Sequence, residues 1–289
     1  MKCDLHVHTV HSGMCTVLVF QRICRESYSD PDEVYATLKR RGMDLVTVTD
    51  HDSIDSSERL RRHPDFFLSE EVTCHTSRGT ELHVGVYDIR ERDHVEIQRR
   101  RDDLAALFAY LNERELLFSI NHAFSGLTGS RAEGDFDDFA EYFPAVEVLN
   151  GQMLPVANRH AEAFAARYRK IALAGSDSHT LAGLGRTYTR VQGARDGREF
   201  VEGLKQGRTE AFGEAGSYPK LLRAVLAISC AMIGERRWTM ALAPLMSGVP
   251  LVVAAIVARE MAFARHWGRY ATRRSSTPEL ANAVPELSR

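Results

Sequence analysis

The chain has 289 residues, of which 26% are charged, with 37 Lys and Arg against 39 Asp and Glu and a formal net charge of −2. This length and ordinary composition favour one large α/β domain, with or without an appendage, and exclude disordered and fibrous proteins. The five cysteines form no CxxC pair and are odd in number, so we expect no complete disulfide framework and a reducing compartment. No apolar signal segment precedes the first predicted strand, which favours the cytoplasm.

Short apolar runs alternate with stretches of helical periodicity along the first part of the chain. Helices are predicted at 31–41, between the cap Asp30 and the stop Gly42, and at 93–114 and 156–170. Strands are predicted at 2–7, 44–49, 66–73, 81–89, 116–121, 145–150 and 171–176. Seven strands with interleaved helices predict a mostly parallel sheet, open or closed as a barrel.

Two histidines lie in the first predicted strand, in the motif D-L-H-V-H-T at 4–9. Because residues i and i+2 of a strand point to the same face, His6 and His8 can direct two imidazoles at one metal ion. A half-buried strand that carries two histidines by chance is the alternative. Acids and histidines also recur at or near the ends of the later strands: His51, Glu71, His83, His122, Glu147, Asp177 and His179. In a parallel barrel those ends meet on one face, where active sites are built, so a shared site is predicted.

These motifs resemble those of the PHP family, the polymerase and histidinol phosphatase domains. The matching pieces are D-L-H-V-H-T at 4–9, T-D-H-D at 49–52, S-E-E-V at 69–72, His83, N-H-A at 121–123 and G-S-D-S-H at 175–179. The resemblance covers about the first 190 residues and implies a distorted seven-stranded (β/α) barrel that binds two or three divalent metal ions. Many members hydrolyse phosphate esters.

The resemblance also implies a set of metal ligands, with Glu71 as a bridging carboxylate: His6, His8, His51, Glu71, His83, His122, Asp177 and His179. Family members usually place a further acid or histidine near positions 13 and 14, where this chain has Gly13 and Met14, and His11 and Cys15 do not stand at the matching place. The number of ions therefore stays open between two and three. Imidazoles and carboxylates without thiolate suit zinc, manganese or iron rather than magnesium or calcium.

Further residues are predicted to act around the metal ions. Asp177 and His179 are catalytic candidates together with Arg186, which we expect to bind a phosphoryl oxygen, although a surface arginine at the rim explains it equally well. Asp4 and Asp50 are expected to orient imidazoles rather than to bind metal. Glu147 is the weakest acid candidate. The Gly-containing segment 126–135 is either a substrate lid or an ordinary surface loop.

The last part of the chain differs in charge and hydropathy. Residues 218–289 carry ten Lys and Arg against four Asp and Glu, a balance of +6 that leaves −8 for residues 1–217. Residues 240–258 contain no charge and are long enough to cross a bilayer, but Pro244, Gly248 and Pro250 interrupt helical continuity. Arginines on both sides favour an interfacial or re-entrant segment within 221–258 at the inner face of a membrane, and a buried hairpin or dimer contact is the alternative.

We therefore expect three parts: a metallophosphoesterase barrel at 1–217, an apolar and basic tail at 218–274, and a disordered end at 275–289. The predicted activity is hydrolysis of a phosphate ester by a metal-activated hydroxide. A non-catalytic metal-binding module tethered to a membrane is the alternative, and hydrolysis of a carbon–nitrogen bond is a third reading. The substrate class covers nucleotides, sugar phosphates and lipid-linked phosphates, with no nucleic-acid signature in the barrel. The sequence leaves the oligomeric state open.

Overall fold

The computed structural model describes residues 1–15, 21–235 and 237–272, so the expected disorder of residues 275–289 lies outside the described residues. The strands are β1 (Lys2–Cys3), β2 (Ser69–His75), β3 (Glu81–Tyr87), β4 (Leu117–Ile120), β5 (Ala145–Asn150), β6 (Ile171–Gly175), β7 (Thr187–Val191) and β8 (Thr209–Gly213). The α-helices are α1 (Pro31–Arg40), α2 (Ser57–Leu60), α3 (Glu91–Arg100), α4 (Leu104–Glu113), α5 (Asp135–Tyr142), α6 (Pro155–Arg167), α7 (Gly197–Lys205), α8 (Tyr218–Glu235), α9 (Val249–Trp267) and α10 (Arg269–Thr272). Two 3₁₀ helices, η1 (Val10–Ser12) and η2 (Arg237–Gly248), complete the elements.

The strands form two open sheets, in the orders β2-β3-β4-β5-β6 and β1-β7-β8. Strand β3 runs antiparallel to β2 and β4, whereas β5 is parallel to β4 and β6. The α/β class is confirmed, but the described strands form neither the mostly parallel sheet nor the closed seven-stranded barrel that the sequence led us to expect. The second sheet was only partly foreseen, since β7, α7 and β8 were not predicted.

The expected barrel does not close at places where side chains replace backbone groups as hydrogen-bond acceptors. In the first predicted strand, Val7 N donates to Thr49 Oγ1 at 3.0 Å and Thr9 N donates to Asp50 Oδ1 at 2.6 Å. Ser176 N, just after β6, donates to Asp4 Oδ1 at 2.7 Å. A ladder needs backbone partners on both sides, so the predicted strands at 2–7 and 44–49 shorten to β1 and to isolated parallel bridges such as Val7–Ser178 and Val46–Phe66. The two sheets remain in contact, since β6 lies against β7 and β8.

Other boundaries follow local signals. Strand β5 spans the predicted residues 145–150, and α1 begins after its cap Asp30, which accepts from Asp32 N. The predicted helix at 93–114 is instead two helices, because the Asp103 side chain accepts from Ala106 N and caps a new helix, α4. A polar residue inside an amphipathic stretch thus ended one helix and began another.

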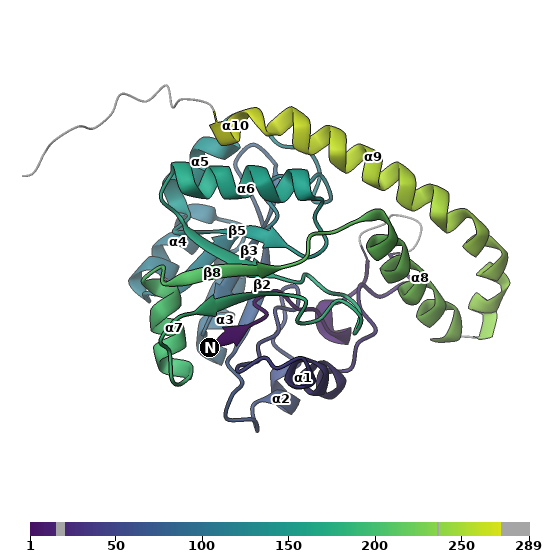
Figure 1. Ribbon diagram of the computed structural model, residues 1–289, viewed down its shortest axis with the longest axis horizontal. Coiled ribbons are helices and arrows are strands. Elements are labelled where there is room, and N and C mark those ends of the chain that lie inside the picture. Colours follow the sequence, from purple (N-terminus) through teal and green to yellow (C-terminus); the bar gives the residue numbers. More distant parts are fainter. Residues whose placement is uncertain (16–20, 236, 273–289) are drawn as a thin grey trace, which may run out of the picture.

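The main core lies between the five-stranded sheet and helices α4, α5 and α6, which flank the sheet in Figure 1. It is rich in aromatic rings, including the fully buried Phe118, Phe136, Phe139 and Phe164. A stack of Phe136 on Tyr270, with centroids 5.1 Å apart, attaches α10 to this core. The C-terminal end of the described chain is therefore part of the packed fold.

Helices α8 and η2 pack against each other, and α9 continues back along the outside of the molecule to α6 and α10 (Figure 1). The Tyr218 hydroxyl donates to Pro250 O at 3.2 Å, which joins the start of α8 to the start of α9. Glu235 at the end of α8 accepts from Arg25 Nε at 3.2 Å. One helical stretch, Trp238–Thr272, is apolar and long enough to cross a membrane, which by itself is weak evidence for such a crossing.

Candidate metal centre

All eight residues that the family resemblance implies as ligands converge on one place, where the central carboxylate is that of Glu71. Its Oε2 lies 3.1 Å from His6 Nε2 and 3.4 Å from both His8 Nε2 and His51 Nδ1. Its Oε1 lies 3.3 Å from His122 Nε2 and 3.6 Å from His83 Nδ1. The two oxygens thus face different sets of imidazoles, as a carboxylate between two cations does.

Asp177 supplies the second carboxylate, 3.5 Å from His6 Nε2, 3.4 Å from His8 Nε2 and 3.7 Å from His179 Nδ1. Asp177 and His122 both have a positive φ, of 50° and 31°, which is unusual for residues other than glycine. Such backbone strain persists only where the surrounding structure enforces it, and it concentrates at functional sites. The sequence motif around Asp177 contains Gly175, where a Cβ would lie 2.3 Å from His6 Cβ, so only glycine lets β6 approach the His6 backbone.

His83 reaches the cluster in a way that the sequence did not predict. It lies near the beginning of β3, because β3 is antiparallel to its neighbours and pairs His83 with Thr73 of β2. The prediction that each ligand lies near the C-terminal end of a parallel strand is therefore wrong for His83. His51 fits the rule better, since it forms an isolated parallel bridge with Glu71.

Glu26 is a neighbour of the cluster that sequence reasoning missed. Its Oε2 lies 3.5 Å from His51 Nε2 and its Oε1 lies 4.0 Å from His179 Nε2. Glu26 N donates to Gly13 O at 3.1 Å, and Met14 pairs with Arg25, so residues 25 and 26 lie beside residues 13 and 14. Glu26 thus lies beside positions 13 and 14, where an acid or histidine was expected. No local sequence signal marks Glu26, because its contacts with His51 and His179 depend on the pairing of residues 25 and 26 with residues 13 and 14.

Hydrogen bonds from a surrounding layer hold the imidazoles in place. His6 Nδ1 is 2.8 Å from Glu147 Oε1, so the acid ranked weakest from the sequence contacts the first histidine directly. His8 Nδ1 is 2.9 Å from Ser12 Oγ, which in turn donates to Asp50 Oδ1 at 2.7 Å. Asp50 therefore contacts His8 through Ser12, and its orienting role stays a prediction. Such partners set which ring nitrogen is free to bind metal.

Asp4 and two asparagines complete this layer. Asp4 accepts from Ser176 N and Gly185 N, both at 2.7 Å, and so joins the segment after β6 to the first motif rather than touching an imidazole. Asn121 Nδ2 donates to Glu71 Oε1 at 2.8 Å. Asn150 Nδ2 donates to Asp177 Oδ2 at 3.0 Å and to Glu147 Oε2 at 2.9 Å. The carboxylates are fixed as firmly as the imidazoles.

The protonation states of the cluster follow from burial and from charge. Burial holds the pKa of His51 well below its usual value and lowers the pKa of His179 to about 3. Burial also acts on His83, but Glu71 outweighs it and raises the pKa of His83 to about 10. The pKa of Glu71 lies well below its usual value, because His6, His83 and His51 outweigh its desolvation. The centre thus combines an ionised Glu71 and neutral His51 and His179, the forms in which these groups bind metals, with a protonated His83, which would have to release its proton to bind one.

The arrangement fits metal ions better than hydrogen bonding alone. The ligand atoms form four overlapping groups, and within each group all atoms lie within 4.8 Å of one another. The groups are His8, His51 and His179; His6, His8 and Asp177; His6, Glu71 and His122; and His51, Glu71 and His83. Among the described residues, His8 Nε2 and His122 Nδ1 are buried without a hydrogen-bond partner. A buried polar atom left unpaired is costly, so an electrophile such as a metal ion would satisfy His8 Nε2.

The cluster lines one side of a cavity of about 480 Å³. Leu127, Met153 and Ile256 form apolar parts of its wall, and Arg259 of α9 is the one Arg or Lys among the described residues that line it. The predicted phosphate-binding residue, Arg186, does not line this cavity. It is half exposed, 3.6 Å from Glu214, and lines a separate cavity with Lys220 and Arg223.

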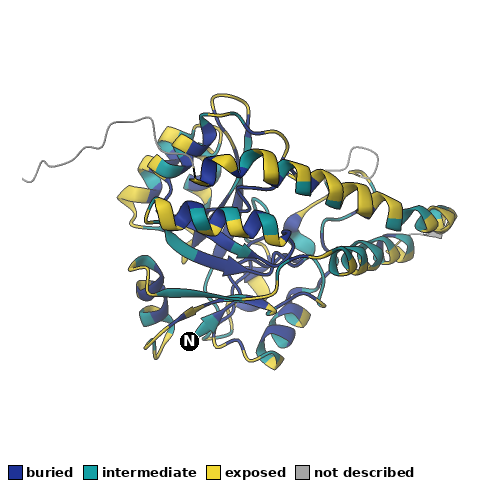
Figure 2. Cartoon of the chain, turned by 45° about the horizontal axis from the view of Figure 1, so that its top comes forward, coloured by how far each residue is buried: buried dark blue, intermediate teal, exposed yellow. Residues whose placement is uncertain are grey.

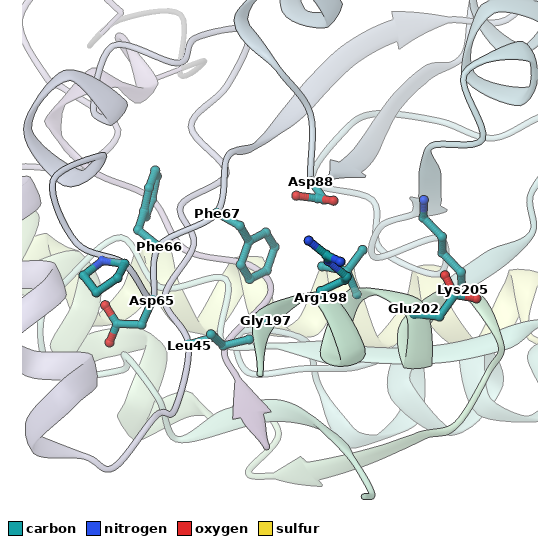
Figure 3. A pocket seen from close by; sticks show the side chains of 11 residues that line it. Leu45, Asp65, Phe66, Phe67, Asp88, Gly197, Arg198, Glu202 and Lys205 are labelled. Atoms are coloured by element: carbon teal, nitrogen blue, oxygen red, sulfur yellow. The ribbon is translucent and has the colours of Figure 1, made fainter. Parts of the chain in front are cut away.

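A third cavity, of about 400 Å³, lies at the opposite end of the segment 45–51 and is drawn in Figure 3. Leu45, Phe66 and Phe67 form its apolar side, while Asp88, Glu202 and Lys205 bring charges of both signs. This mixture favours no single class of ligand, and none of the four ligand groups is there.

Fold and site together define an α/β protein with a buried centre of imidazoles and carboxylates suited to divalent metal ions. A family model described as PHP-associated matches residues 155–209. This match includes the motif G-S-D-S-H at 175–179 and supports the resemblance to the PHP family that the sequence motifs indicate. No curated protein matches the chain in sequence.

Solved structures resemble the chain at low sequence identity, and one of them shares its fold. PsfC from Pseudomonas syringae PB-5123 is 17% identical, with a TM-score of 0.58 over 80% of this chain and 98% of PsfC. A candidate metal-dependent phosphoesterase from Bifidobacterium adolescentis is 14% identical, with a TM-score of 0.46 over 70% of this chain and 95% of that protein. The lesion-specific endonuclease PfuEndoQ from Pyrococcus furiosus is 17% identical, with a TM-score of 0.49 over 73% of this chain and 57% of that protein. The expected absence of a nucleic-acid partner finds no support among these relatives.

Proposed function

We propose that this protein is a metal-dependent phosphoesterase whose active site is the cavity beside Glu71. The observation that carries the proposal is the position of Glu71, whose two oxygens face separate sets of imidazoles within 3.6 Å. Divalent ions bound there would lower the pKa of a water molecule toward neutrality and would offset the charge of a phosphoryl group. The donor set of imidazoles and carboxylates favours zinc, manganese or iron.

The ligand groups argue for at least two ions. His6, His8 and His51 each belong to two of the four groups, but the other nitrogen of His6 and of His8 is engaged with Glu147 and with Ser12. If each imidazole serves one ion, two complete groups remain in any of three combinations, and in one of them the two groups share the Glu71 carboxylate. Glu26, close to His51 and His179, would complete a third position.

The chain's own residues position the substrate. Arg259 offers the cation that would bind a phosphoryl oxygen, the role that the sequence had given to Arg186. Asp177 and His179 line the cavity and stay held by Asn150 and by the backbone, so the reacting group would meet fixed charges. Little else is needed, because phosphoryl transfer depends mainly on positioning and on charge stabilisation.

The test is metal analysis of the purified protein combined with hydrolysis of an aryl phosphate. We expect at least two ions per chain and a hydrolytic rate that a chelator abolishes and added zinc or manganese restores. Activity that resists chelation would contradict the proposal. Full occupancy with no turnover over a panel of phosphate esters would also contradict it, and would favour the non-catalytic metal-binding module.

A further inference from the structure

An apolar face on the outside of the molecule has no partner within the described chain. Ten large apolar side chains are exposed among the described residues, and six of them lie close together in sequence on η2 and α9. We call these six the apolar face: Trp238, Met240, Leu245, Leu251, Val252 and Ile256. Leu251 is 76% exposed and Met240 is 64% exposed. Figure 2 shows α9 exposed along most of its length. A helix that is apolar on nearly all sides normally lies in a core or in lipid.

The ends of this helical stretch are fixed to the domain. Glu260 accepts from Ser125 Oγ at 2.7 Å and from Gly126 N at 3.0 Å, and the Trp267 ring stacks on Phe136 with centroids 5.7 Å apart. Glu235, just before η2, is bonded to Arg25. A straight crossing of the bilayer would break these contacts and would place the Glu260 carboxylate in hydrocarbon. The attachment therefore favours a helix that lies in the plane of an interface.

Basic side chains predominate around the apolar face, although Arg269 lies 3.5 Å from Glu133 and Glu235 pairs with Arg25. Arg259, Arg265 and Arg269 are exposed on α9 and α10, close to the face in sequence. At the start of α8, Lys220 and Arg223 line a cavity with Arg186, where Lys220 Nζ has no hydrogen-bond partner among the described residues. A second copy of the chain on this face would bring like charges together, whereas an anionic lipid surface complements them.

The apolar face also continues into the proposed active site. Ile256 belongs to the face and lines the cavity, and the neighbouring Leu127 lines it as well and is 52% exposed. Arg259, one turn after Ile256, adds a cation at the same edge. One wall of the cavity is therefore apolar and cationic, and the cavity opens beside the apolar face.

We propose that the apolar face docks in the plane of an anionic lipid bilayer and that the substrate is a phosphate ester carried by a lipid. The substrate part of this inference rests on the proposed phosphoesterase function. The apolar part of the lipid would stay in the bilayer beside Leu127 and Ile256, while its phosphate reaches Arg259 and the metal centre. Docking would place the cavity at the level of the lipid headgroups.

Binding is tested by co-sedimentation of the full chain with phosphatidylcholine vesicles, with and without phosphatidylglycerol. We expect binding that phosphatidylglycerol strengthens and that the double variant L251E/V252E weakens by about tenfold or more. Both positions are exposed and lie in the first turn of α9, where acids suit the helix dipole, so the fold should be retained. The matched control is V95E/Y142E, which adds the same charges at exposed sites far from α9 in sequence and should bind as the wild type does.

Absence of binding to either vesicle would overturn the docking. A concentration-dependent dimer in sedimentation velocity that L251E/V252E abolishes would also overturn it, in favour of a second copy on the same face.

The substrate class is tested by comparing phosphatidic acid in these vesicles with a soluble aryl phosphate. We expect L251E/V252E to slow hydrolysis of the vesicle-borne phosphate by about tenfold and to leave hydrolysis of the aryl phosphate unchanged. Equal rates for the variant and the wild type on phosphatidic acid would overturn the lipid substrate. Vesicle binding without hydrolysis of either phosphate would overturn the proposed function and would leave the docking supported.

Discussion

Glu26 and His51 lie with Oε2 and Nε2 3.5 Å apart, although Glu26 belongs to a loop segment that no motif marks. A hydrogen bond from Glu26 N to Gly13 O places this acid beside Gly13 and Met14, which offer no ligand. Glu26 is therefore the residue with which the number of bound cations can be tested.

Replacement of Glu26 by Gln should remove the acid from the position near His51 and His179. We expect the metal content of the purified protein to fall by about one ion per chain, because a neutral amide is a much weaker ligand than a carboxylate. Metal analysis after dialysis measures the change. Glu33→Gln, at an exposed position on α1, is the control and should keep the wild-type content. An unchanged content in Glu26→Gln would show that two positions suffice.

Glu71 should be the least replaceable residue of the centre. Glu71→Gln removes the charge that faces five imidazoles, so we expect loss of metal and a fall in hydrolytic rate of about a thousandfold or more. Glu70→Gln is a sharp control, since this neighbour points away from the centre to His94 and Gln98. Rate and metal content are measured on both variants, and similar losses in both would contradict a special role for Glu71.

Glu147→Gln tests the hydrogen bond that orients His6. We expect metal affinity or rate to fall by about 10–100-fold, the usual effect of losing a carboxylate behind a metal-binding histidine. Competition with a chromophoric chelator measures the affinity. Glu141→Gln, exposed on α5, should behave as the wild type. Wild-type affinity in Glu147→Gln would mean that Asn150 and the backbone orient the site without this charge.

Removal of metal should lower the thermal stability. The centre is buried and carries ionised carboxylates, so bound cations would stabilise the folded state. One ion present at 100 times its Kd adds about 2.7 kcal/mol to the free energy of unfolding. We expect the Tm to fall by roughly 5–10 °C in chelator and to recover with metal. Differential scanning calorimetry measures it. An identical Tm with and without metal would indicate that the folded protein holds no ion.

The pair of His94 and Glu70 should contribute stability that depends on pH. The hydrogen bond at 2.7 Å raises the pKa of His94, so its contribution is fully present below the unfolded pKa near 6.5 and is lost as pH rises through the higher folded pKa. His94→Gln should therefore lower the free energy of unfolding more near pH 6 than near pH 9, by about 1 kcal/mol. Urea titrations at both pH values measure this difference, with the exposed His75→Gln as control. A larger loss near pH 9 would contradict it.

The sequence predicted the elements whose signals are local. Helix α1 follows from Asp30, and β5 follows from a run of apolar residues, so both appear where they were expected. The break between α3 and α4 was missed, because a cap at Asp103 outweighed a continuous amphipathic pattern. The prediction of a closed barrel was wrong, because the side chains of Thr49, Asp50 and Asp4 form hydrogen bonds with backbone groups that a strand ladder would otherwise use.

By itself, the sequence determined the resemblance to a family and the kinds of side chain offered as ligands, because histidines and acids in fixed motifs limit the chemistry that a site can perform. Only the tertiary structure decided which of these side chains meet, since contacts between residues far apart depend on how strands and loops close. It placed Glu26 and Glu147 at the centre, moved Arg186 away from it and set Arg259 at the cavity edge. Sequence spacing carries no information about such distances, because they arise only when separate elements pack together.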